Sequence, residues 1–445
     1  MASQQTTRRP QLLQAGIDAF AQPDVRRKIL FTLGMLIVFR FAAHIPLPNV
    51  DPEALRRTFD NNAILGFLNI FSGGALRSLS VAALGVYPYI TASIIMQLAV
   101  PLIPRLQALS KEGGEAGRQR IQIYTHWMTI PLAALQGYAQ LMLIQQLGGV
   151  TNIGFGSGNT LATIAALASM VAGTMFLVWI GELISEQGIG NGVSLIIFAG
   201  IVAGLPSILG GSLFTGVGTA VTGLLTLAVI AIGLVYAIIF VQEAQRRIPV
   251  QYARSTFRGG RMYRQQGQTH IPLRVNSAGM VPLIFAFSIM IFPPVFAQFV
   301  ATTVDVGWIA STAKFVQNAF APTAPLYWLM VFLMVMIFSF FYTLVVFQQQ
   351  NLAENLQRQG GFIPGIRPGR PTQEYVMRVL IRITWGGAIF LGIVSVVPFF
   401  AQAVTDVQSV QVSAAGLLIV VGVVLDTMRQ IEAQMMMRNY EGFIS

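Results

Sequence analysis

Ten long apolar tracts run through this 445-residue chain, and they constrain its fold more than any other feature. Each tract is about 20 residues long, the length that an α-helix needs to cross the hydrocarbon core of a bilayer. Only 10% of the residues are charged, so the chain lacks the polar surface of a soluble domain. We therefore predict an all-α, polytopic membrane protein with spans at residues 29–48, 81–104, 123–146, 159–182, 193–212, 218–241, 276–300, 325–347, 383–402 and 411–428.

Positive charge alternates between the connecting segments. When the N-terminus is placed in the cytoplasm, 23 of the 28 lysines and arginines fall on inner segments: before residue 29, at 105–120, 246–274 and 358–382, and after 428. Lys and Arg accumulate on the cytoplasmic side of membrane proteins, so both termini are predicted to be cytoplasmic. Arg26-Arg27-Lys28 precedes an apolar run with no evident cleavage site, and we expect this run to stay as the first span.

The ten tracts divide into five plus five. An odd number of spans per half makes the second half enter the membrane upside down, although the pattern alone leaves such an inverted repeat open. We expect a cytosolic segment at 1–27, a first half at 28–212, a second half at 213–430 and a cytosolic tail at 431–445. Residues 10–22 fit a helix on the membrane surface, either an ordinary lead-in or a partner site.

One apolar segment, at about 61–78, is too short to cross the membrane. Gly73 and Gly74 interrupt any helix there. Irregular backbone at membrane depth must be buried in protein, because lipid offers it no hydrogen bonds. The segment is either a re-entrant plug or a loosely packed outer cap, and we favour the plug.

Two inner loops, 242–275 and 348–382, are long and basic. In the first, extended stretches at Ile248–Tyr252 and His270–Arg274 flank Gly259-Gly260 and predict a hairpin. In the second, two Pro-Gly steps enforce tight turns around Arg367. Such loops commonly set topology and contact anionic lipid. Their length and prolines favour a further role, the docking of a large negatively charged partner.

The residues that several other protein classes require are missing from the sequence. None of its three lysines, Lys28, Lys111 and Lys314, is followed by Ser or Thr, so there is no Walker loop. There is no His-Glu-x-x-His pattern and no cysteine, which argues against a metalloenzyme or cysteine nucleophile. The charged residues within the predicted spans are Arg40, Glu182 and Asp426, and each lies near the end of its span. An ion-coupled transporter would need ionisable residues in mid-membrane, so this class is disfavoured. A passive path without a cofactor remains.

An ordered set of motifs resembles the bacterial SecY family of protein-translocation channels. The set comprises Phe71–Leu76, Ala83–Gln97, Gly188–Gly192, Ile197–Ile201, Gln245–Val250, Val275–Gly279 and Phe362–Gly369. The resemblance implies two five-helix halves around a central pore, which opens across the membrane for secreted chains and sideways for membrane segments. It also implies a bacterial plasma-membrane location.

The resemblance also implies four groups of functional residues. The pore ring would be Val86, Ile90, Ile197, Ile284 and Ile419. The plug would contain Ile64, Phe67, Ile70, Phe71, Ser72, Gly73, Gly74, Ala75 and Leu76. The lateral gate, between the second and third spans and the seventh and eighth, would include Thr91, Gln136, Asn276, Ser288 and Phe292. Arg254, Arg261 and Arg367 would contact a SecA-like motor ATPase or the ribosome.

The partners that the resemblance implies are SecE-like and SecG-like small membrane subunits, signal peptides, nascent secretory or membrane proteins and anionic lipids. Two other classes compete with this interpretation. A secondary transporter would need broken helices around a small-molecule site in mid-membrane, and a membrane enzyme would need a catalytic set.

Overall fold

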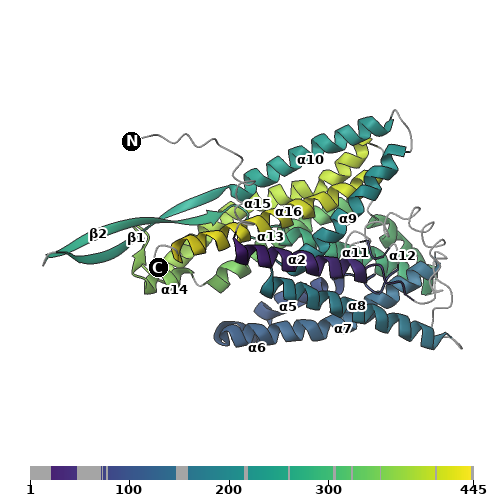
Figure 1. Cartoon of the computed structure of the whole chain (residues 1–445), viewed down its shortest axis with the longest axis horizontal. Helices are drawn as coiled ribbons and strands as arrows, with labels where there is room; N and C mark the ends of the chain where they lie inside the picture. Colours follow the sequence, from purple (N-terminus) through teal and green to yellow (C-terminus); the bar gives the residue numbers. More distant parts are fainter. Residues whose placement is uncertain are drawn as a thin grey trace.

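The computed structural model is a bundle of long helices with one projecting β-hairpin (Figure 1). It describes residues 22–47, 72, 74–76, 79–146, 159–214, 219–258, 261–303, 307–321, 324–350, 352–405 and 408–441. The predicted surface helix at 10–22 lies outside these residues except for Gln22.

Each predicted tract coincides with one long helix. These helices are α2 (Pro23–Ala42), α5 (Tyr87–Leu102), α7 (Gly114–Gln146), α8 (Thr160–Gln187), α9 (Gly192–Phe214), α10 (Thr219–Glu243), α11 (Val281–Thr303), α13 (Pro325–Gln350), α15 (Arg370–Thr405) and α16 (Gln408–Glu441). In the described part of the chain, three are long and apolar enough to cross a membrane by length and composition, namely α8, α13 and α15. A fourth candidate is the bent pair of α5 and α6, and the count of ten spans stays a prediction.

Several boundaries differ from the predicted tracts. Residues 81–86 form turns, so α5 begins only at Tyr87, and it ends at Leu102 before a 99° bend into α6 (Pro104–Glu112). Pro101 and Pro104 explain the bend, because proline cannot donate the helical hydrogen bond. Helices α7, α15 and α16 extend past their tracts with polar turns, so much of the inner loop at 348–382 and of the tail at 431–445 is helical.

The predicted hairpin is confirmed and is longer than expected. Strands β1 (Gln245–Arg258) and β2 (Arg261–Arg274) pair antiparallel along their whole length, with Ile248 opposite Ile271. A two-residue strand, β3 (Gly361–Phe362), adds to β1 and gives the sheet order β2-β1-β3. The second basic loop is therefore joined to the first, with α14 (Leu352–Arg358) beside β3.

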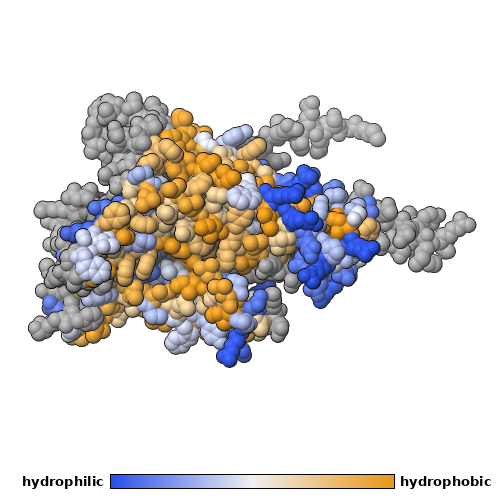
Figure 2. Space-filling model, turned by 180° about the vertical axis from the view of Figure 1, so that it is seen from behind, coloured by the Kyte–Doolittle hydropathy of each residue, from blue (hydrophilic) through white to orange (hydrophobic). Residues whose placement is uncertain are grey.

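The two ends of the bundle differ in character. The hairpin, α6 and α14 gather at one end in Figure 1, while α12 (Gly307–Ala319) lies at the other. In Figure 2 a broad apolar band covers the middle of the molecule, and hydrophilic side chains collect at the hairpin end. This end carries the segments predicted to be inner, because the hairpin, α6 and α14 contain or adjoin the basic segments 105–120, 246–274 and 358–382.

Candidate functional site

The five residues predicted to form a ring converge in the interior. They come from the residue preceding α5 and from α5, α9, α11 and α16, so both predicted halves contribute. All are buried in one apolar cluster, with exposures of 0% for Val86, 4% for Ile90, 1% for Ile197, 6% for Ile284 and 1% for Ile419. Four separate helices thus bring aliphatic side chains to one central cluster.

A cavity of about 380 Å³ lies against this cluster. Three of the five ring residues, Ile90, Ile197 and Ile284, form part of its lining. The rest of the lining is largely polar, and includes Gln97, Glu182, Ser185, Glu186 and Asn191. The cavity therefore offers a polar space on one side of the aliphatic cluster.

The described part of the predicted plug packs against the same region. Ala75 belongs to the central cluster, and Leu76 belongs to a neighbouring cluster with Leu79 and Met170. The Ser72 hydroxyl accepts a hydrogen bond from the Leu76 N–H at 3.0 Å. The other plug residues, Ile64, Phe67, Ile70, Phe71 and Gly73, lie outside the described residues.

The end of the plug segment is tied to the chain that follows α2. Pro46 and Ser80 form an antiparallel bridge, flanked by hydrogen bonds from Leu47 N–H to Leu79 O and from Val81 N–H to Ile45 O. Gly74 has a φ of +84°, and a methyl group there would lie 3.5 Å from Nη1 of Arg40. The one cation of the first span is thus beside the plug.

The residues predicted for the lateral gate are only partly brought together. Gln136 Nε2 donates to Thr91 Oγ1 at 3.5 Å, which joins α7 to α5 within the first half. Asn276 Nδ2 instead donates to Gly279 O at 2.9 Å, so it stabilises the turn before its own helix. In the described part of the chain, no hydrogen bond joins Asn276 to Thr91 or Gln136. The structure therefore joins Thr91 to Gln136, while Asn276 bonds within its own turn.

Ser288 and Phe292 lie on α11, as predicted, but in different surroundings. Ser288 is 1% exposed, while Phe292 is 46% exposed and stacks on Phe296 with ring centroids 5.6 Å apart. A hydrogen bond that does cross from α5 to α11 is made by Tyr87, which the sequence did not single out. Its hydroxyl donates to the carbonyl oxygen of Ser288 at 2.6 Å. The sequence contained one sign of this contact, namely a tyrosine in an apolar tract. A tyrosine hydroxyl that is buried usually needs a hydrogen-bond partner.

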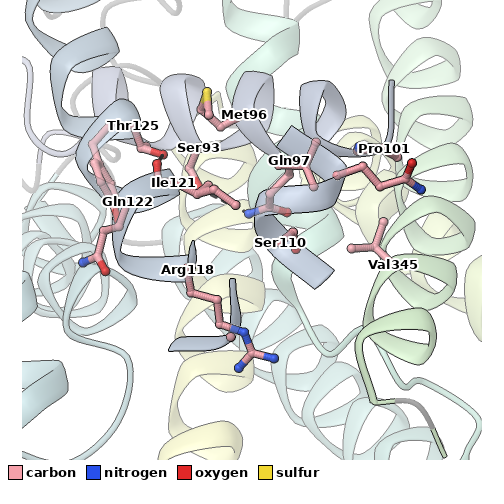
Figure 3. A pocket seen from close by; sticks show the side chains of 14 residues that line it. Ser93, Met96, Gln97, Pro101, Ser110, Arg118, Ile121, Gln122, Thr125 and Val345 are labelled. Atoms are coloured by element: carbon pink, nitrogen blue, oxygen red, sulfur yellow. Dashed lines mark hydrogen bonds between the residues drawn. The ribbon is translucent and has the colours of Figure 1, made fainter. Parts of the chain in front are cut away.

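A groove opens where α5, α6 and α7 face α13 (Figure 3). It has a volume of about 430 Å³ and is lined by α5, α6 and α7 on one side and by Val345 of α13 on the other. Met96 and Ile121 give it apolar surface, and Arg118 lies at its polar edge. The groove therefore lies between α5 and α13, which the opening of a lateral gate would move apart.

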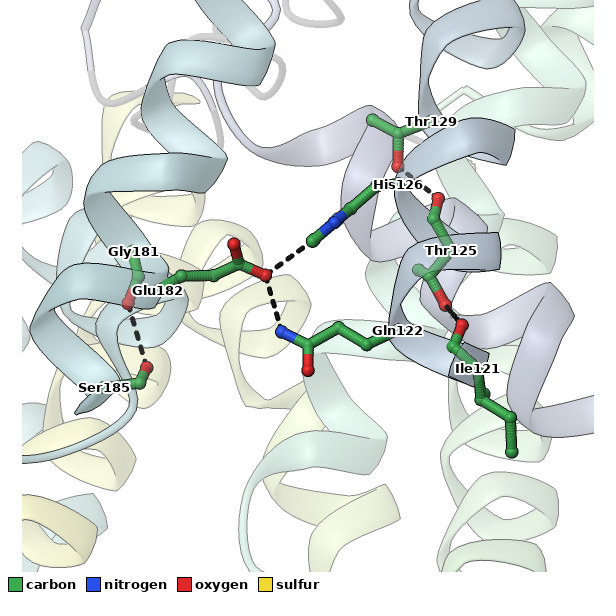
Figure 4. Close-up of polar contacts among 8 residues, drawn as sticks. All are labelled: Ile121, Gln122, Thr125, His126, Thr129, Gly181, Glu182 and Ser185. Atoms are coloured by element: carbon green, nitrogen blue, oxygen red, sulfur yellow. Dashed lines mark hydrogen bonds and ion pairs between the residues drawn. The ribbon is translucent and has the colours of Figure 1, made fainter. Parts of the chain in front are cut away.

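A polar cluster that the sequence analysis missed joins α7 to α8 (Figure 4). Oε1 of Glu182 lies 2.6 Å from both Nε2 of His126 and Nε2 of Gln122. The His126 ring also packs beside Tyr89 of α5, with centroids 5.8 Å apart. The sequence alone does not indicate this contact, because Glu182 lies far from His126 along the chain. In the described residues, no group of three potential metal ligands occurs.

The predicted docking arginines differ in their surroundings. Arg367 is exposed on a turn between Gly365 and Gly369, both at positive φ, and Thr372 Oγ1 donates to its carbonyl oxygen at 2.8 Å. Arg254 and Arg261 lie on the paired strands of the hairpin, opposite Gln265 and Arg258. An apolar cluster under the hairpin base, which includes Ile248, Val250 and Ile363, joins both basic loops.

The hairpin base is also tied to α16. Nη2 of Arg429 donates to the carbonyl oxygen of Gln242 at 2.8 Å. Burial, followed by the neighbouring charge of Arg274, lowers the pKa of the Arg429 guanidinium. The hairpin, α10 and α16 therefore meet at a partly buried arginine.

Comparisons with known proteins assign the family. A family model described as SecY matches residues 80–428. The protein translocase subunit SecY of Streptomyces scabiei is 42% identical over 97% of this chain and 100% of that protein. The chain belongs to the SecY family. The SecY subunit of Thermus thermophilus is also 42% identical, over 98% of each chain.

Solved structures show the same fold at lower identity. A protein-conducting channel matches with a TM-score of 0.61 and 16% identity, over 96% of this chain and 97% of that one. Sec61 from a canine ribosome-channel complex matches with a TM-score of 0.59 and 15% identity, over the same shares of the two chains. The SecY-family fold is thus shared with channels of distant sequence.

Proposed function

We propose that this SecY-family chain passes unfolded secretory polypeptides across the bacterial plasma membrane and releases apolar segments sideways into the bilayer. The observation that carries the proposal is the convergence of Val86, Ile90, Ile197, Ile284 and Ile419 in one buried cluster between the two predicted halves. A ring of aliphatic side chains excludes water when it is empty, as in hydrophobic gates of channels. The same side chains can move apart around a passing chain without breaking hydrogen bonds.

The plug and the polar cavity support the same path. Ala75 packs in the ring cluster, so the described end of the plug segment lies against the proposed constriction. The cavity against the ring is lined by polar groups that can hydrogen-bond to an unfolded chain, including Gln97, Glu182 and Asn191. An entering polypeptide would therefore move from a wet space through a dry ring and displace the plug.

The lateral exit would lie between α5 and α7 on one side and α11 and α13 on the other. The groove at the inner end of this seam has lining from both sides, and its apolar surface suits the hydrophobic part of a signal peptide. Polar contacts between membrane helices are worth about 1 kcal/mol each, so an apolar segment can compete with them. The gate residues in this proposal are Thr91, Gln136, Ser288 and Phe292, with Asn276 holding the turn before α11.

Energy would come from partners at the basic end. The sequence carries no Walker loop, so we propose that a SecA-like ATPase pushes the chain or a ribosome extrudes it. The hairpin with Arg254 and Arg261 and the exposed turn with Arg367 would form the docking surface. SecE-like and SecG-like subunits would support the two halves within the membrane. Anionic lipids would contact the basic inner end. Both chain termini would lie in the cytoplasm.

The test is reconstitution in vesicles with the motor ATPase and a stalled preprotein. Because the chain has no cysteine, single cysteines at Ile90, Ile197 or Ile284 can carry a photo-reactive group without competing thiols. We expect crosslinks to the stalled chain at all three positions and none at Ile232 of α10, which lies outside the ring and is 71% exposed. Transport of small solutes without any polypeptide crosslink would contradict the proposal and favour a transporter.

A further inference from the structure

Tyr87 joins the two sides of the proposed lateral gate. Its hydroxyl donates to the carbonyl oxygen of Ser288 across 2.6 Å, and the two residues are 201 positions apart in sequence. Tyr87 begins α5, and Ser288 lies in the second turn of α11. Both are buried, with exposures of 8% and 1%. The hydrogen bond therefore connects the halves at membrane depth, next to the ring residues Val86 and Ile90.

The acceptor belongs to the backbone and not to the serine side chain. The Ser288 hydroxyl has no hydrogen-bond partner in the part of the chain that the structure describes. A carbonyl oxygen has two lone pairs, so it can accept from a phenol while it stays in the helix. The interaction is thus independent of the side chain at position 288.

Tyr87 is also connected to the third span. Thr91 Oγ1 donates to the carbonyl oxygen of Tyr87 at 3.1 Å, and Gln136 Nε2 contacts Thr91 Oγ1 at 3.5 Å. A line of polar contacts therefore runs from α7 through α5 to α11. Its last step, from Tyr87 to Ser288, is the one that crosses between the two proposed sides of the gate.

Opening the gate would break this hydrogen bond between α5 and α11. If α5 and α11 separate, the hydrogen bond between the Tyr87 hydroxyl and the Ser288 carbonyl oxygen is lost. Lipid at this depth offers neither group another hydrogen-bond partner. The aromatic ring, in contrast, packs in the central apolar cluster with Leu283 and Phe287 and can keep apolar neighbours. The hydroxyl is therefore the part of Tyr87 that distinguishes the closed gate from the open one.

We propose that Tyr87 is a positioning residue that holds the lateral gate closed, and that its hydroxyl sets how apolar a segment must be to open the gate. This inference rests on the proposed function of the chain as a protein-conducting channel. A strongly apolar signal segment gains enough from lipid contact to open the gate whether or not the Tyr87 hydroxyl is present. A weakened signal, with one or two apolar residues replaced, depends on how firmly the gate is held.

The test is the Tyr87→Phe variant, which removes the hydroxyl and keeps the ring. Hydrogen bonds between membrane helices have measured strengths that correspond to about 3-fold to 15-fold in an equilibrium constant. In reconstituted vesicles with the motor ATPase, we expect the variant to translocate a preprotein with a weakened signal about 3-fold to 15-fold more than the parent chain does. A preprotein with an intact signal should cross at the same rate through both.

A second measurement reports the gate directly. Spin labels on cysteines at Ile95 of α5 and Phe296 of α11, both exposed, measure the separation of these helices. Tyr87→Phe should increase the population of longer distances. Tyr236→Phe, which removes a phenol from a residue 73% exposed on α10, is the matched control and should change neither readout.

Three outcomes would overturn the inference. One is an unchanged ratio between weakened and intact signals in Tyr87→Phe, and another is an unchanged distance distribution. The third is a Ser288→Ala variant with an effect as large as that of Tyr87→Phe, because this would assign the effect to packing and not to the hydrogen bond. Failure of the parent chain to translocate the intact preprotein would instead count against the proposed function itself.

Discussion

At the scale of single residues, a variant of Arg367 can distinguish a docking role of this arginine from a structural role. Its side chain is exposed, and the turn is held through its backbone carbonyl, to which Thr372 donates. Arg367→Glu should therefore leave the fold intact while it reverses the charge that a partner meets. We expect at least about a tenfold loss of motor-driven translocation, the size of a lost charge-assisted contact. Translocation assays and thermal unfolding in detergent measure the two effects separately.

The control for this prediction is Arg370→Glu, the same charge change at an exposed residue at the start of α15. A loss confined to Arg367→Glu supports a specific contact. Equal losses in both variants would point to general attraction between the basic end and its partner, and unfolding of Arg367→Glu would show that the arginine is structural.

The Glu182 carboxylate gives a second prediction at this scale. It accepts a hydrogen bond from Gln122 and lies 2.6 Å from Nε2 of His126, so Glu182→Ala removes both contacts. We expect the free energy of unfolding to fall by about 1–3 kcal/mol. Glu186→Ala, one helical turn further along α8 and exposed, is the matched control. Equal thermal stability of the two variants would show that the cluster contributes nothing to holding α7 against α8.

Single residues also show where sequence reasoning stops. Val86, Ile90 and Ile197 were predictable because they lie in recognisable motifs, whereas Ile284 and Ile419 followed only from the family resemblance. The structure places all five in one cluster. Tyr87 lies inside one of these motifs, but its partner is 201 residues away and is a backbone atom. His126 and Glu182 likewise meet only through helix packing. Residue type and spacing along the chain contain no information on such contacts.

At the scale of elements, α15 approaches the junction between the hairpin and α11 through a glycine. A methyl group at Gly387 would lie 2.5 Å from the carbonyl oxygen of Val275, whereas one at the preceding Gly386 would meet nothing within 4 Å. Gly387→Ala should therefore push α15 from the residues just before Asn276 and cost about 1–3 kcal/mol of stability. Gly386→Ala should be nearly neutral, and comparing the thermal unfolding of the two variants provides the test.

Elements were predicted better than their boundaries. Hydropathy placed a helix at each tract, and the extended stretches of the first basic loop predicted the hairpin. The pattern did not show that α5 begins at Tyr87 or bends by 99° into α6, because prolines and turns decide these points. It also did not show β3, a two-residue strand that exists only because β1 is beside it.

At the scale of the whole molecule, the basic end and the aliphatic centre are linked through packed elements. The apolar cluster under the hairpin includes Val376 and Leu380 of α15, which continues into the membrane bundle. At the hairpin base, Arg429 ties α10 to α16, the helix that carries Ile419. A partner that docks on the hairpin therefore contacts elements that reach the ring.

The seal is a property of the whole molecule, because its five ring residues come from both halves. Ile197→Ser would place a hydroxyl in the aliphatic cluster and lower the barrier to water entering the ring. We expect vesicles with this variant to leak ions and small solutes while still translocating preproteins. Ile201→Ser is the matched control, since Ile201 lies one turn further along α9, is similarly buried at 6% and is not in the ring. Both changes should lower the free energy of unfolding by about 2–5 kcal/mol. If the ring forms the seal, the leak should be confined to Ile197→Ser. Equal leakage through both variants would instead assign the seal to core packing in general.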